Sequence, residues 1–158
     1  MTPEGQWEVR VAHVELSLSE SLTHGPSADP AGSFDRWVTT VAISNEPCLV
    51  IDRDRLIVAA SPACCELLGL SAPGETPVGR HLLDGVLRLV DFTAARSALT
   101  SNEMEKIPPV LALSSKRLAR GLMRVHDGAS LDATVDAIAT PLSDGRDVVG
   151  SLTFLSPV

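Results

Sequence analysis

The chain has 158 residues, the length of one ordinary domain, and its 44% hydrophobic and 21% charged residues are typical of a globular protein rather than a disordered one. A net charge of −7 and an aromatic content of two Trp, three Phe and no Tyr argue against nucleic acid as a partner, because phosphate contacts need Lys and Arg and base stacking needs aromatic rings. No apolar run approaches the roughly 20 residues that cross a bilayer, and no secretory signal is visible, so we expect a cytoplasmic protein without a membrane partner.

Residues 1–24 are predicted to form a separate amphipathic helix. Apolar residues recur there every three or four positions, which places a narrow apolar stripe on one side of a helix. A strand is the alternative, because Val9 and Val11 alternate with polar residues, but this alternation breaks at Ala12 and His13. A stripe this narrow suits a dimer seam or a strip that lies across the domain.

A linker rich in breaker residues is expected at residues 25–33, followed by a helix that precedes the sheet at residues 34–45. Ser33 can cap this helix. Apolar residues at the i, i+3, i+4 and i+7 positions give it one buried face, and these are Phe34, Trp37, Val38 and Val41.

From residue 48 the pattern changes to short runs rich in β-branched residues. Residues 48–51 and 56–60 are two such runs around a polar turn, which predicts a β-hairpin. Ser61 and Pro62 then begin a short helix that Gly69 can terminate.

The middle of the chain is less regular. Residues 71–77 are expected to form a loop. Residues 78–116 are predicted to form several short helices, interrupted by Pro108 and Pro109.

The last third contains the clearest strands. Residues 118–125 are a strand candidate, and the Asp127-Gly128 pair that follows is typical of a tight hairpin. The next strand alternates apolar and polar residues from 131 to 140, which predicts one buried and one solvated face. Asp144-Gly145 predicts another turn before a final strand at residues 148–155.

Two strands, several short helices and three further strands indicate an α+β fold with an antiparallel sheet. In this order and spacing, residues 46–156 resemble a PAS sensor domain. The segments that carry the resemblance are Leu49-Val50-Ile51-Asp52-Arg53-Asp54, Leu56-Ile57-Val58, Pro62-Ala63, Glu66-Leu67-Leu68-Gly69, Val78-Gly79-Arg80-His81-Leu82-Leu83, His126-Asp127-Gly128, Thr140-Pro141-Leu142, Asp144-Gly145 and Val148-Val149-Gly150.

The resemblance implies a PAS-like domain at residues 46–158, with a five-stranded antiparallel sheet, short helices packed on one face and an N-terminal helical extension. It also implies a non-enzymatic sensory or interaction role in bacterial signal transduction or transcription regulation. The chain departs from the family at Arg55, where members often have Gly, and at Ser61, where they often have Asn. That Asn commonly ties the second strand to the helix after it.

The resemblance further implies homodimerisation through the sheet and the helix before its first strand. Because no output domain fits in the remaining residues, the expectation is that a protein partner supplies the output or that the chain is a fragment of a longer regulator. The residues assigned to the dimer seam are Trp7, Val11, Val14, Leu18, Trp37, Val38 and Val41.

The inward face of the central strand carries three alanines, at positions 133, 137 and 139, which fill little space. Either helices pack closely on the sheet there, or a pocket for a small apolar ligand remains. A ligand sensor and a pure interaction module with a filled core are therefore both hypotheses. The predicted ligand-binding residues are Val50, Val58, Leu68, Leu82, Leu87, Met123, Val125, Val135, Ala137 and Leu152.

The adjacent thiols Cys64 and Cys65, with Cys48 upstream, suggest a redox switch as another alternative. A zinc site is not expected, because paired cysteine ligands are usually two to four residues apart. A nucleophilic pair of either thiol with His81 is the catalytic alternative, but no oxyanion-hole motif accompanies it in the sequence.

No cofactor is expected either. PAS domains that bind haem usually take the ligand from a helix in the middle of the domain, and residues 93–116 contain no His. The Asn-Cys-Arg motif of the flavin photosensors is also absent.

One basic cluster remains, and its functional interpretation is an anion or partner contact. A solvated face is the alternative. The cluster consists of Lys116, Arg117, Arg120 and Arg124.

Overall fold

The structure is a computed structural model that describes residues 32–70, 74–126 and 132–158. The predicted helix at residues 1–24 and most of the predicted linker lie outside the described residues, as does the Asp127-Gly128 turn. Within the described residues, no helix is long and apolar enough to cross a membrane.

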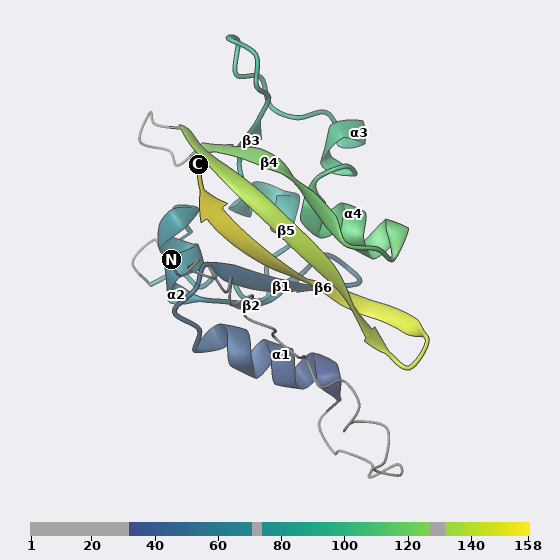
Figure 1. Cartoon of the computed structure of the whole chain (residues 1–158). Helices are drawn as coiled ribbons and strands as arrows, with labels where there is room; N and C mark the ends of the chain where they lie inside the picture. Colours follow the sequence, from purple (N-terminus) through teal and green to yellow (C-terminus); the bar gives the residue numbers. More distant parts are fainter. Residues whose placement is uncertain (1–31, 71–73, 127–131) are drawn as a thin grey trace, which may run out of the picture. The chain divides into compact units, whose positions relative to one another are not determined.

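Six antiparallel strands form one sheet in the order β2-β1-β6-β5-β4-β3 (Figure 1). Five of them confirm the predicted strands. The sixth, β3, falls where the sequence predicts helix, because Leu89 and Val90 pair with Val125 and Arg124 of β4. The strands are β1 (Cys48–Asp52), β2 (Ile57–Ala60), β3 (Leu89–Val90), β4 (Ala119–His126), β5 (Asp132–Asp144) and β6 (Asp147–Pro157).

Short helices cover one face of the sheet, as predicted, and the helix before the first strand lies on the other face. We call the face beneath the short helices the inner face and the opposite one the outer face. In the described residues between β2 and β4, four short helical segments accompany β3, and α4 is the longest of them. The helices are α1 (Ser33–Ala42), α2 (Pro62–Leu67), the single π-helical turn η2 (Leu82–Val86), α3 (Ser101–Met104) and α4 (Pro108–Ser115).

The helix α1 packs on the outer face through residues one helical turn apart. Phe34 and Val38 are partly buried there, and Val41 is 1% exposed. They contact a cluster that includes Val50 of β1 and Leu152 of β6, which are paired across the two strands. The predicted positions i, i+4 and i+7 therefore form the buried face of this helix, whereas the predicted burial of the i+3 residue, Trp37, is wrong, since it is 38% exposed.

Ser61 joins the first two strands to the helix that follows them. Its hydroxyl accepts hydrogen bonds from the backbone N–H of Cys48 and of Cys64, both at 3.1 Å, and donates to the carbonyl of Glu46 at 2.7 Å. The side chain is fully buried. Serine thus supplies the strand-to-helix connection for which the PAS family often uses Asn.

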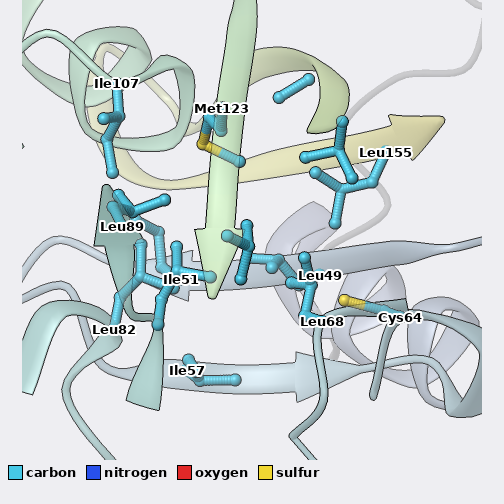
Figure 2. Packing of buried hydrophobic residues seen from close by; sticks show 14 of the residues in the cluster. Leu49, Ile51, Ile57, Cys64, Leu68, Leu82, Leu89, Ile107, Met123 and Leu155 are labelled. Carbon is cyan, nitrogen blue, oxygen red and sulfur yellow. The ribbon is translucent and has the colours of Figure 1, made fainter. Parts of the chain in front are cut away.

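The inner face carries the main hydrophobic core. Alternate residues of β1, Leu49 and Ile51, point into it and meet side chains from α2, η2 and the remaining strands. Figure 2 shows these side chains converging between the sheet and the helices. Those labelled there are Leu49, Ile51, Ile57, Cys64, Leu68, Leu82, Leu89, Ile107, Met123 and Leu155.

Small residues on the inner face let α4 lie directly on the sheet. Ala112 of α4 forms a buried cluster with Ala119 and Ala139. A Cβ added at Gly121 would lie 3.5 Å from Cγ of Pro108, which is ordinary van der Waals contact. Close packing, one of the two alternatives for the alanine-rich strand, is therefore what the structure shows at α4.

Candidate interaction surface

The outer face of the sheet is only partly covered by α1. The covered part includes Val50, Ala59, Leu142 and Leu152, which are buried. Beyond it, on β4, β5 and β6, three large apolar side chains are exposed to solvent. They are Leu122 (54% exposed), Ile138 (37%) and Phe154 (42%), and we call them the sheet patch.

Strand pairing places the sheet patch on one continuous surface. Ile138 is the direct cross-strand partner of both Arg120 on β4 and Phe154 on β6. Leu122 is the cross-strand partner of Asp136. Because directly opposed side chains in antiparallel strands share a face, these residues lie together on the outer side.

An ion pair lies within the sheet patch. Arg120 Nε is 3.1 Å from each carboxylate oxygen of Asp136. This hydrogen-bonded guanidinium holds the pKa of Asp136 below its usual value, and the carboxylate raises the pKa of Arg120. A charged pair therefore lies among three exposed apolar side chains on the outer face.

Sequence reasoning missed all three residues of the sheet patch. The signal was present in β5, where Asp132, Thr134, Asp136 and Thr140 make the outer face polar and Ile138 interrupts that series. An apolar residue on an otherwise solvated strand face indicates either a covering element or a contact surface.

Three residues of the predicted dimer seam lie on α1. Val41 is fully buried and Val38 half-buried, and both pack against the chain's own sheet, so the face of α1 that they form is already occupied. Trp37 is 38% exposed and remains accessible. Four further seam residues lie outside the described residues, and they are Trp7, Val11, Val14 and Leu18.

The structure also divides the predicted ligand-binding residues between the two faces. Val50, Val58 and Leu152 belong to the outer cluster beneath α1 and not to the inner core. The reason is the parity of β1, since Leu49 and Ile51 take the inward positions. The other seven lie together in the inner core at 0–5% exposure, and they are Leu68, Leu82, Leu87, Met123, Val125, Val135 and Ala137.

Two of the three cysteines, Cys48 and Cys64, are buried, and Cys65 is half-buried. Cys64 is buried, and desolvation, followed by the neighbouring Cys65 and Cys48, raises the pKa of its thiol far above the usual range. Because the thiolate is the reactive species, this environment opposes redox chemistry at Cys64. The side chain of His81 caps η2, since its Nδ1 accepts a hydrogen bond from the N–H of Leu83.

The predicted basic cluster is not one surface of unpaired cations. Arg120 pairs with Asp136, and Arg124 Nε lies 3.3 Å from a carboxylate oxygen of Asp132. Lys116 ends α4 in a left-handed conformation, with φ of 58°. Among the residues that the structure describes, no group of three or more His, Cys, Asp and Glu side chains could hold a metal ion.

Asp132 is the centre of a second charged network, at the end of the sheet near β3. Its side chain is only 4% exposed and contacts Arg96 at 3.2 Å, Arg124 at 3.3 Å and Nδ1 of His126 at 2.9 Å. Arg124 also donates to the carbonyls of Asp91 and Thr93. The network therefore attaches the loop after β3 to β4 and β5.

This network makes stability depend on pH. The hydrogen bond from His126, and then Arg96 and Arg124, lower the pKa of Asp132 in the folded protein. A lowered folded-state pKa stabilises the fold above the unfolded value of about 3.9, and this contribution is lost as the pH falls through the folded pKa. We expect Asp132→Asn to lower the urea midpoint at neutral pH and to reduce the further loss on acidification to about pH 3.

The matched control for this prediction is Asp54→Asn, which removes a carboxylate from the exposed turn between β1 and β2. Its midpoint at neutral pH should stay close to that of the unmodified chain. If Asp132→Asn lost as much stability on acidification as the unmodified chain, the assignment of this pH dependence to Asp132 would be wrong.

No protein-family model and no curated protein matches the sequence. Solved structures do match the fold. The PAS domain of a protein from Colwellia psychrerythraea has a TM-score of 0.55 at 13% identity, with 79% of this chain and 96% of that chain covered. A light-oxygen-voltage (LOV) protein from Rhodobacter sphaeroides has a TM-score of 0.54 at 14% identity, with 79% and 66% covered.

A third similar structure is the VqmA dimer of Vibrio cholerae, a LuxR-type receptor, with a TM-score of 0.52 at 17% identity. The match covers 78% of this chain and 50% of that chain. At such identities the likeness concerns the fold, and it agrees with the strand order and the helices described above. The described part of this chain has the PAS fold.

Proposed function

We propose that this chain is a PAS-type sensory or regulatory interaction module that acts by forming a homodimer and contacting a protein partner that supplies the output. The observation that carries the proposal is the sheet patch, three exposed apolar side chains around the ion pair of Arg120 and Asp136. Solved structures of similar fold include a PAS domain from a two-component sensor histidine kinase and a VqmA dimer, which supports a signalling role.

A second copy of the chain suits this surface. Most soluble homo-oligomers are two-fold symmetric, and a two-fold interface brings the same patch of both copies together. Arg120 and Asp136 are adjacent and of opposite charge, so in such a pair each arginine can approach the other copy's aspartate. The apolar residues around them would lose contact with water on association.

The inner core favours this function over the alternatives. Seven of the ten predicted ligand-binding residues belong to the buried core, and Ala112 of α4 packs on Ala139, one of the three alanines that suggested a pocket. The thiol switch is disfavoured by the raised pKa of Cys64. An interaction module with a filled core is therefore the better supported of the hypotheses.

The test is native mass spectrometry and sedimentation equilibrium on the full chain, purified under reducing conditions. The unmodified chain is expected to be a dimer without bound small-molecule mass. Ile138→Ser, on the sheet patch, is expected to weaken the dimer by at least about tenfold, because a central apolar contact is lost. Its circular dichroism spectrum should be unchanged.

Ile43→Ser is the matched control. It makes the same change at a residue that is 79% exposed at the end of α1, and it should leave the dimer unaffected. A monomeric unmodified chain, or equal dimer affinities for the two variants, would refute the proposed interface. An additional mass on each subunit would instead favour a ligand sensor.

A further inference from the structure

A groove at the edge of the inner core lies where three elements meet. The turn between β1 and β2 contributes Arg53 and Arg55, α4 contributes Val110, Leu113 and Ser114, and β6 contributes Val148. The groove has a volume of about 250 Å³. None of the predicted ligand-binding or dimer-seam residues lines it, so it is separate from the surfaces considered above.

The wall of the groove is held in an unfavourable backbone conformation. Arg55 has φ of 64°, in the left-handed region that non-glycine residues rarely adopt. Its guanidinium forms two hydrogen bonds with the carboxylate of Glu105, at 2.7 and 2.8 Å. The side chain of Asp52 accepts from the N–H groups of Asp54 and Leu56, which fixes the turn. A strained residue held by such contacts is typical of a functional position.

The two arginines of the groove differ in their ion pairing. Glu105 neutralises Arg55, and this ion pair lowers the pKa of Glu105. Arg53 is exposed and has no ion pair within the described part of the chain. The groove therefore presents at its rim one guanidinium without an ion pair, that of Arg53, which Asp52 and Asp54 flank in the turn.

The rest of the lining is mainly aliphatic. Val110 is buried, while Leu113 and Val148 are half-buried. The hydroxyl of Ser114 donates to the carbonyl of Leu111 at 3.2 Å, so Arg53 is the donor that the groove offers to an anion. An anionic head group next to an aliphatic tail matches this combination of a free guanidinium and an apolar floor.

We propose that this groove binds a short-chain aliphatic carboxylate, with the carboxylate on Arg53 and the tail against Val110, Leu113 and Val148. The volume lies just below the roughly 300–1,000 Å³ of sites for drug-sized molecules, which limits the ligand to a small one. The guanidinium provides charge-assisted hydrogen bonds to the head group, and the aliphatic residues provide the apolar contact.

The test is a titration of the full chain with hexanoate, followed by the backbone amide signals in NMR spectra. Saturable shifts are expected at Arg53, Ser114 and Val148. Acetate, which has the charge without the tail, and hexan-1-ol, which has the tail without the charge, should each bind at least about tenfold more weakly.

Arg53→Gln is expected to weaken hexanoate binding by at least about tenfold, since it removes the charge from an exposed turn without disturbing the core. Arg88→Gln, which removes the same charge from another exposed position, should bind hexanoate like the unmodified chain. Linear shifts without saturation, equal binding by the two variants, or shifts confined to other residues would overturn the proposal. Saturable shifts produced equally by acetate would identify a simple anion site and would also overturn it.

Discussion

Gly150→Ala is expected to destabilise the protein by about 3 kcal/mol, because there is no room for a side chain at this position of β6. A Cβ at Gly150 would overlap both the carbonyl oxygen of Ile51 on β1 and the ring of Phe34 on α1. The sheet and the helix that covers it meet over this glycine. Either α1 must move off the sheet or the pairing of β1 with β6 must distort. Urea unfolding followed by circular dichroism measures the loss.

Gly121→Ala is the matched control for this prediction. The added Cβ at this strand position would make only ordinary contacts with the ring of Pro108, at 3.5 and 3.9 Å. Its unfolding free energy should change by less than about 1 kcal/mol. If the two glycine variants were equally stable, the close contact of Gly150 with Phe34 of α1 and Ile51 of β1 would be refuted.

Ser61→Ala is expected to lower the unfolding free energy by about 3 kcal/mol. The substitution leaves the N–H groups of Cys48 and Cys64 without their acceptor and removes the donor to the Glu46 carbonyl. The position is fully buried, so water cannot replace the hydroxyl without opening the structure. The loss includes the N-cap of α2, and urea unfolding at neutral pH would measure it.

The control here is Ser44→Ala. The hydroxyl of Ser44 accepts a hydrogen bond from the exposed N–H of Glu46 at 3.1 Å, which water can replace. Its cost should stay below about 1 kcal/mol. A Ser61→Ala variant as stable as the Ser44→Ala variant would show that Ser61 is not the connection between strand and helix that we infer.

Local sequence patterns predict most elements of the described part of the chain. The alternation of residues 131–140 corresponds to β5, and Asp144-Gly145 corresponds to a turn in which Gly145 has φ of 62°. Ser61 and Pro62 begin α2 as expected. These signals are readable because each depends on the conformation of a few neighbouring residues.

Where an element depends on a distant partner, the local pattern fails. Leu89 and Val90 lie in a segment whose composition favours helix, yet they form β3 because β4 offers them backbone partners. Arg55 likewise occupies a left-handed position that a local argument would assign to glycine, and its contact with Glu105 supports it there. Neither partner can be recognised from the sequence around these residues.

The sequence by itself determined the order of the elements, the antiparallel α+β architecture and its resemblance to PAS domains, because periodicity, capping and turn residues act locally. Only the tertiary structure decided which apolar residues of the sheet are buried and which are exposed. Val50 of β1 and Leu152 of β6 are buried on the outer face because α1 covers them, whereas Ile138 on the same face is exposed because nothing in the described residues covers it. The burial of a strand residue depends on what packs against its side of the sheet, and that is decided by segments distant in the chain.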